Sequence, residues 1–121
     1  MAKVLVAEDD TFLSSLLIRA LQAEKLDGQA AYDGVQTIEK AKSWQPDIIL
    51  LDILMPNKDG FEVMEALRAD PATAQTKVVV LSNLGDPENI ERIKKFNVID
   101  YMVKANTTPH EVVEKIKGFI A

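Results

Sequence analysis

The chain has 121 residues, which suits one compact domain. Its 14 Lys and Arg against 19 Asp and Glu give a net charge of −5, which argues against a DNA-binding surface, since that requires a basic stripe. The hydrophobic content of 47% is typical of a globular domain, the absence of cysteine excludes disulfides and thiolate chemistry, and the single histidine excludes a multi-histidine metal site.

The sequence also limits where the protein works. No apolar stretch reaches the roughly 18 residues of a transmembrane helix, and the N-terminus does not resemble a secretory signal. We therefore expect a cytoplasmic protein that engages neither a membrane nor nucleic acid directly. Its chemistry must be carried by carboxylates, hydroxyls and lysines.

The first half of the chain alternates short apolar runs with amphipathic stretches. Val4–Ala7 predicts a strand buried on both faces, and the leucines that follow recur at helical spacing, with Asp10 or Thr11 as the N-cap. A weaker strand is expected over Gln29–Tyr32. The helix after it ends before Pro46.

The second half repeats this pattern. Strands are expected at Ile48–Leu51, Val78–Leu81 and Tyr101–Val103, and helices at 61–67, after the Asp86 cap and after the Thr108 cap. Buried strands that alternate with helices form a parallel sheet covered on both faces. We predict an α/β, flavodoxin-like, doubly wound (βα)5 sandwich with a five-stranded sheet of order 2-1-3-4-5.

Polar residues follow four of the five predicted strands. Glu8 and Asp9 follow the first strand, Asp52 the third, Ser82 the fourth and Lys104 the fifth. Parallel strands bring their carboxyl ends to one sheet edge, where α/β proteins bind ligands. Taken singly, each residue is equally well a helix cap, a turn residue or a surface charge. Their shared position favours a site.

Three converging carboxylates predict a hard divalent cation, Mg²⁺ first and Mn²⁺ as the alternative. Asp52, at the end of the central strand, is the candidate nucleophile that accepts a phosphoryl group. Asp9 would bind the metal directly and Glu8 through water. Ser82 and Lys104 would hold phosphate oxygens.

At these residues the chain resembles the receiver domain of response regulators, of the chemotaxis type. The resemblance spans residues 1–121 as a single domain. It rests on Val4-Leu5-Val6-Ala7-Glu8-Asp9-Asp10, Leu50-Leu51-Asp52-Ile53-Leu54-Met55-Pro56, Asp59-Gly60, Val80-Leu81-Ser82 and Asp100-Tyr101-Met102-Val103-Lys104.

The resemblance implies that a histidine kinase or phosphotransfer protein phosphorylates Asp52. Mg²⁺ would be held by Asp9, Asp52 and the backbone carbonyl of Leu54, with Glu8 through water. Ser82 would be the hydroxyl switch and Tyr101 the aromatic switch of a two-state element.

The same resemblance implies an output face on the fourth helix, fifth strand and fifth helix. That face would comprise Ile90, Lys94, Lys95, Tyr101 and the surroundings of Val112. We expect an unidentified output protein to bind there, because the chain ends with the fifth helix and leaves no room for an output domain. The alternative is that the sequence is part of a longer protein. We expect a monomer, with phosphorylation-driven dimerisation as the alternative.

Three features depart from the family pattern. Ala105 stands where proline is usual, so we expect either a trans peptide with a shifted loop or a strained cis one. Asn83 stands where a small residue is usual and would crowd or gate the phosphate pocket. Leu54 and Leu84 are apolar flanking positions, from which we expect slow self-dephosphorylation.

Other functions remain open at this point. A degenerate receiver would serve as a phosphorylation-independent docking module, an interpretation that Asn83 and Ala105 favour. An aspartyl phosphohydrolase usually has a second Asp two residues after the first, where this chain has Leu54. A nucleotide-binding protein would need a glycine-rich loop, which is absent. We expect no enzyme activity beyond weak self-phosphorylation and self-dephosphorylation.

Overall fold

The computed structural model describes residues 1–120, so Ala121, the end of the expected domain, lies outside the described residues. Five strands form one parallel sheet in the order β2-β1-β3-β4-β5, which confirms the predicted fold class. The elements are β1 (Lys3–Ala7), α1 (Thr11–Ala23), β2 (Asp27–Ala31), α2 (Gly34–Trp44), β3 (Ile48–Leu51), α3 (Gly60–Ala69), β4 (Lys77–Ser82), α4 (Pro87–Lys94), β5 (Asp100–Val103), a 3-10 turn (Lys104–Asn106) and α5 (Pro109–Ile120).

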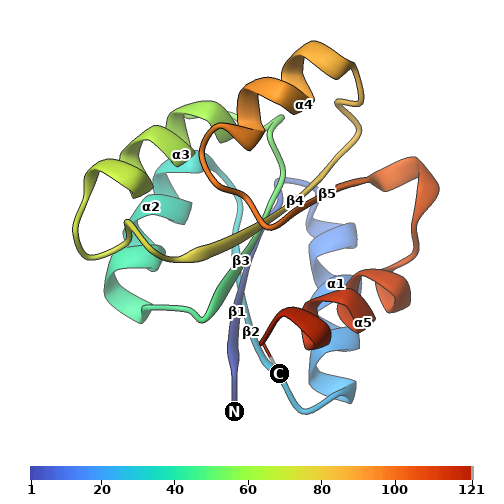
Figure 1. The fold of residues 1–121 in the computed structure, drawn as a ribbon. Coiled ribbons are helices and arrows are strands. Elements are labelled where there is room, and N and C mark those ends of the chain that lie inside the picture. The colour runs from blue at the N-terminus through green and yellow to red at the C-terminus, as the bar shows by residue number, and fades with distance from the viewer. Residues whose placement is uncertain (121) are drawn as a thin grey trace.

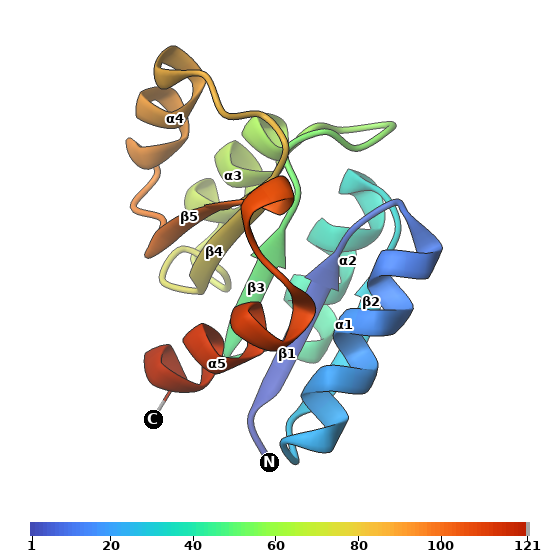
Figure 2. The ribbon, with the colours of Figure 1, turned by 90° about the vertical axis from the view of Figure 1, so that its right-hand side faces the viewer.

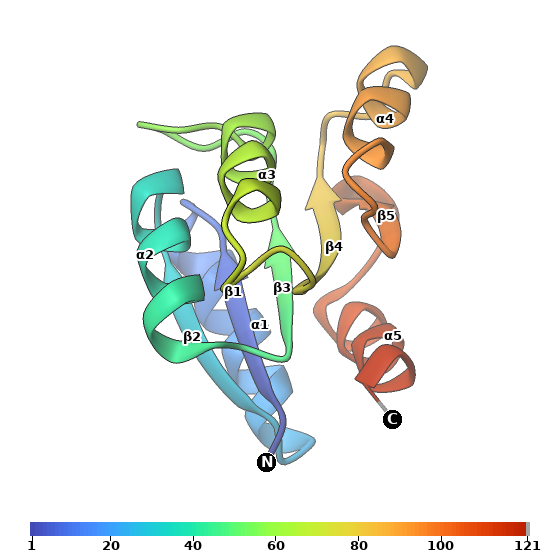
Figure 3. The ribbon, with the colours of Figure 1, turned by 60° about the vertical axis from the view of Figure 1, so that its left-hand side comes forward.

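The helices cover both faces of the sheet. α1 and α5 lie on one face, and α2 and α3 lie on the other with α4 beyond them (Figure 1). Figure 3 shows α2 and α3 side by side. Among residues 1–120, no helix combines the length and the apolar character needed to cross a membrane.

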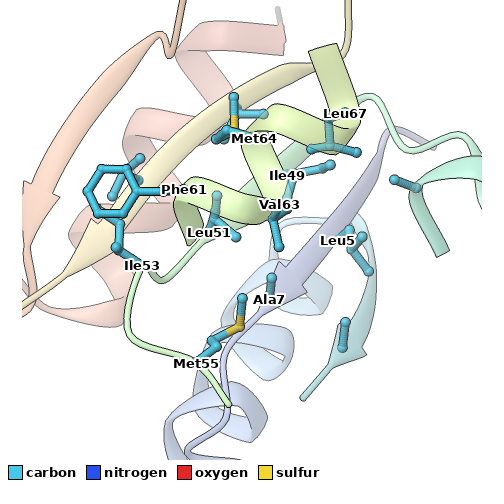
Figure 4. Packing of buried hydrophobic residues seen from close by; sticks show 14 of the residues in the cluster. Leu5, Ala7, Ile49, Leu51, Ile53, Met55, Phe61, Val63, Met64 and Leu67 are labelled. Carbon is cyan, nitrogen blue, oxygen red and sulfur yellow. The ribbon is translucent and has the colours of Figure 1, made fainter. Parts of the chain in front are cut away.

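The strands β1, β3 and β4 each supply both halves of the core, because successive side chains of a strand point to opposite faces. Val4 and Val6 pack in the cluster on the α1 and α5 side, whereas Leu5 and Ala7 pack in the cluster on the α2 and α3 side. Figure 4 shows Phe61 and neighbouring side chains of α3 lying over the second of these clusters. The unbroken apolar runs of the sequence therefore reflect burial on two sides.

Both boundaries of β2 differ from the sequence prediction, whereas the N-cap of α1 is one of the two predicted residues. β2 begins at Asp27 and ends at Ala31, whereas the sequence predicted Gln29–Tyr32. Its register pairs Lys3 with Asp27, so backbone pairing with β1 sets the start of the strand. The N-cap of α1 is Asp10, whose side chain accepts from the N–H groups of the first turn.

Close backbone contacts fix the loop between β3 and α3. A Cβ on Gly60 would lie 2.6 Å from the Cα of Ile53, and one on Gly34 would lie 2.1 Å from the carbonyl oxygen of Lys58. Only glycine allows the backbone to approach this closely. The loop that follows Asp52 is therefore packed between the starts of α2 and α3.

Arg68 ties together two loops at the opposite end of the sheet. Its guanidinium donates to the carbonyl oxygens of Phe96 and Thr76, each at 2.8 Å, and to that of Ala74 at 3.1 Å. Burial lowers the pKa of Arg68 from its ordinary value. The side chain thus joins the α3–β4 loop to the α4–β5 loop without a carboxylate partner.

We predict that Arg68→Leu lowers the free energy of unfolding by about 2–3 kcal/mol, because several partly buried carbonyls lose a charged donor. Urea unfolding measures the change. Arg19→Leu is the matched control, since Arg19 is exposed on α1 and its loss should cost under about 0.5 kcal/mol. Equal effects of the two substitutions would contradict the role of Arg68.

Candidate functional site

The predicted site residues do gather at one edge of the sheet. Glu8 directly follows β1, Asp52 follows β3, Ser82 ends β4 and Lys104 follows β5. Figure 2 shows the chain leaving β1, β3 and β5 at the upper end of the sheet. Because β1 and β3 are neighbours, their two carboxylates are forced together.

Lys104 lies between these two carboxylates. Its Nζ is 2.7 Å from Oδ2 of Asp52 and also forms an ion pair with Oε1 of Glu8. The side chains of Glu8 and Asp52 are only 3% and 4% exposed, so solvent screens the pairs weakly. The sequence did not predict the pairing of Lys104 with Glu8, although their opposite charges at one sheet edge were the available signal.

Backbone N–H groups hold the other oxygen of each carboxylate. Asp10 N–H donates to Oε2 of Glu8 at 3.0 Å, and Leu54 N–H donates to Oδ1 of Asp52 at 3.1 Å. Each carboxylate therefore has one oxygen on the backbone and one on Lys104. This arrangement fixes the orientation of both side chains before any ligand arrives.

The protonation equilibria of the cluster reflect its burial. Burial raises the pKa of Glu8, and the bonds from Lys104 and Asp10 N–H offset this only in part, while the charge of Asp52 adds to it. Burial by itself lowers the pKa of Lys104, but the bonds to Asp52 and Glu8 outweigh it, so the net pKa is raised. The raised pKa of Lys104 means that its ammonium group stays charged. The raised pKa of Glu8 means that the cluster disfavours a further negative charge.

Asp9 completes an acidic group that could hold a metal ion. Glu8, Asp9 and Asp52 each offer a carboxylate oxygen, and these atoms lie within 4.8 Å of one another. Asp9 is exposed whereas the other two are buried, so the group opens to solvent on one side. Carboxylate oxygens are the ligands that Mg²⁺ prefers, so the donor set fits a hard divalent cation.

Ser82 and Tyr101 both contact the backbone of one residue, Leu84, in the β4–α4 loop. Oγ of the fully buried Ser82 accepts from Leu84 N–H at 3.3 Å, and the Tyr101 hydroxyl donates to the Leu84 carbonyl. The two candidate switch residues are thus joined through one peptide segment. Sequence analysis missed this link because Leu84 contributes only backbone atoms.

The expected output face surrounds Val112, and Val112 itself lies in the core. Val112 is 1% exposed and packs in the core cluster on the α1 and α5 side, so it cannot form a binding surface. The helical period of α5 places Val112 and Val113 on the side of the helix that faces the core. Lys94 and Lys95 are exposed, as that surface requires.

The departures from the family pattern are resolved in part. The Lys104–Ala105 peptide is trans and begins a 3-10 turn, and Lys104 nevertheless reaches Asp52. Of the two apolar flanking residues, Leu54 is 54% exposed beside Asp52, whereas Leu84 packs against the core. Any shielding of a phosphoaspartate from water therefore falls to Leu54, and the slow self-dephosphorylation stays a prediction.

Comparisons with known proteins agree with this geometry. The family model described as response regulator receiver domain matches residues 4–117. The DNA-binding dual master transcriptional regulator RpaA of Synechocystis is 35% identical over 118 residues, covering 96% of this chain and 46% of that protein. The chemotaxis protein CheY of Halobacterium salinarum is 30% identical over 110 residues, covering 90% of each. The chain spans about half the length of RpaA and of the MtrA regulators that it also matches.

Solved structures share the fold. The receiver domain of Francisella response regulator 1452 superposes with a TM-score of 0.88 at 28% identity, covering 99% of this chain and 97% of that one. Chemotaxis protein CheY4 of Vibrio cholerae superposes with a TM-score of 0.89 at 26% identity, covering 100% and 99%.

We predict that Tyr101 ionises above the ordinary tyrosine value of 10.0, because burial, then the charges of Asp86 and Asp52, raise its pKa. The protonated Tyr101 therefore contributes to the stability of the folded protein. This contribution to the free energy of unfolding is complete below pH 10.0 and is lost as the pH rises through the raised pKa of Tyr101. Phenolate absorbance in a Tyr32→Phe background, where Tyr101 is the sole tyrosine, measures the midpoint. The urea-unfolded protein is the control, and a folded midpoint at or below that of the unfolded chain would contradict the prediction.

Proposed function

The chain belongs to the response regulator receiver family, and we propose that it is a phosphorylation-dependent signalling switch in which Asp52 accepts the phosphoryl group. The observation that carries this proposal is the buried Asp52 carboxylate at the end of the central strand β3, held by Lys104 and by Leu54 N–H. A carboxylate fixed in this way is a ready nucleophile. We further propose that residues 1–121 act as a single receiver domain.

The transfer step follows from the chemistry of an ionised carboxylate. An oxygen of Asp52 attacks the phosphorus of a phosphohistidine, the P–O bond forms as the P–N bond breaks, and the imidazole takes up a proton. Lys104 shifts from the carboxylate to the new phosphoryl oxygens, which carry more negative charge. Glu8, Asp9 and Asp52, with the backbone carbonyl of Leu54, would hold Mg²⁺ or Mn²⁺, which neutralises charge on those oxygens.

The link through Leu84 suggests how the site reaches the surface. A phosphoryl oxygen on Asp52 accepts from the Ser82 hydroxyl and draws it inward, away from Leu84 N–H, which now donates to that hydroxyl. The Leu84 backbone then loses its bond to Ser82, and the bond from Tyr101 to the Leu84 carbonyl adjusts with it. The surface of α4, β5 and α5, including Ile90 and Lys94, changes as a result and becomes the face for an output partner.

The phosphoryl donor is a histidine kinase or a phosphotransfer protein. Beside Lys104 the surface has a groove of about 390 Å³, lined by apolar residues of α1 that include Phe12 and Leu16. The 65% exposed Phe12 gives a protein donor an apolar contact next to the nucleophile. We place this exchange in the cytoplasm, with the protein as a monomer in its unphosphorylated state and dimerisation through the output face as the alternative.

RpaA and MtrA are named as DNA-binding proteins, and the match leaves about half of each uncovered. For the residues described here, the net charge of −5 favours a protein partner over direct contact with nucleic acid. Output by protein contact at the α4, β5 and α5 face is accordingly our proposal for this chain.

We predict that incubation with acetyl phosphate and Mg²⁺ adds one phosphoryl group to the intact protein, as measured by mass. Asp52→Asn should abolish the gain, because an amide cannot act as the nucleophile. Glu65→Gln, which neutralises an exposed acid on α3, should leave it unchanged. Chelation of Mg²⁺ should also suppress the gain.

Three outcomes would contradict the proposal. If the wild type gains no mass even from a phosphorylated histidine donor, the chain acts as a docking module. If acetyl phosphate is consumed in many turnovers without a stable adduct, the chain is a phosphohydrolase. A mass gain that survives Asp52→Asn would place the acceptor on another residue.

A further inference from the structure

The side chain of Asn83 continues the pairing of β4 and β5 beyond the end of the sheet. The register of the two strands ends where Ser82 pairs with Val103. At the next step the Asn83 side chain takes over, and its Oδ1 accepts from Ala105 N–H at 3.1 Å. A side-chain amide oxygen thus occupies the position that a backbone carbonyl would hold in a longer ladder.

This bond lies directly beside the functional lysine. Lys104 has left the sheet and starts the 3-10 turn Lys104–Asn106, in which Thr107 N–H returns to the Lys104 carbonyl at a long 3.3 Å. From this turn the side chain must reach two carboxylates that follow β1 and β3. The backbone on the far side of Lys104 therefore needs an anchor, and the Asn83 bond supplies one.

The bond exists only because residue 105 is not proline. Proline has no N–H, so it could not donate to Asn83. The two departures from the family pattern, Asn83 and Ala105, therefore act together. Ala105 retains the backbone N–H that proline would lack, and the Asn83 side chain accepts a hydrogen bond from it.

We propose that Asn83 is a positioning residue, which anchors the turn after Lys104 through Ala105 and so holds the ammonium beside Asp52. The inference rests on the proposed function, because placing Lys104 matters only if Asp52 is phosphorylated. Asn83, Lys104 and Ala105 also line one groove, so removal of Asn83 opens access to the site as well as releasing the turn. These two effects act in opposite directions on the rate of phosphorylation. Ala105→Pro separates them, because it removes the bond and leaves the Asn83 side chain in the groove.

A double-mutant cycle tests whether Asn83 and Ala105 act through the same hydrogen bond. Asn83→Ala and Ala105→Pro each remove one partner of the bond, and each should slow phosphorylation by acetyl phosphate roughly five- to tenfold. The double variant should be no slower than the slower single variant, because both changes delete the same bond. Additive losses, or faster phosphorylation of Asn83→Ala, would overturn the proposal and leave Asn83 as a gate.

Gln36→Ala is the matched control. Oε1 of Gln36, on α2, accepts from Tyr32 N–H at 2.9 Å, so the same kind of bond is lost without removing a contact of Lys104 or Ala105. The control should fold and phosphorylate as the wild type does. Urea unfolding of every variant shows whether a slower rate comes merely from loss of the fold.

Hydrogen exchange at the Ala105 amide tests the anchor without any phosphorylation. Exchange should be roughly tenfold faster in Asn83→Ala than in the wild type, because the bond that protects the amide is gone. Equal exchange rates would overturn the anchor even if phosphorylation changes. If the wild type is not phosphorylated but exchange does accelerate, the proposed function fails while the anchor itself stands.

Discussion

The ammonium group of Lys104, between the buried carboxylates of Glu8 and Asp52, is the interaction on which the site depends. The sheet order makes β1 and β3 neighbours, so the two acids are brought together by the fold. β5 lies two strands from β3, about 10 Å away at the usual strand spacing. Only a long side chain spans that distance, which accounts for a lysine there and for a short serine on the intervening strand β4.

The burial of these two carboxylates also explains why the site can bind a cation. Burial of two carboxylates beside the exposed Asp9 leaves more negative charge than one ammonium can balance. The raised pKa of Glu8, which burial causes first, is a sign of this imbalance. A folded protein that retains such a cluster gives up some stability, as functional sites commonly do, and a bound divalent ion would relieve it.

Sequence patterns predicted the parts of the molecule that burial determines. The apolar run Ile48–Leu51 predicts its strand without error, because a strand buried on both faces needs an unbroken run. Boundaries set by pairing were less accurate, as β2 shows, since its start depends on contact with β1. The inward position of Val112 agrees with the helical period of the sequence, which places it on the apolar face of the last helix. The link through Leu84 and the bond from Asn83 to Ala105 involve backbone atoms, which every residue carries and no sequence pattern marks.

The most direct test of this account compares wild type with Lys104→Met by urea unfolding, in metal-free buffer and in Mg²⁺. The account predicts that the substitution destabilises the metal-free protein by about 3 kcal/mol, since it leaves two buried carboxylates unpaired. It also predicts that Mg²⁺ stabilises the variant more than the wild type, because the ion replaces the missing positive charge. Lys117→Met is the control, because Lys117 pairs with Glu24 at 3.4 Å on the exposed surface. Equal stability of variant and wild type without metal, or equal stabilisation of both by Mg²⁺, would contradict the central role of Lys104.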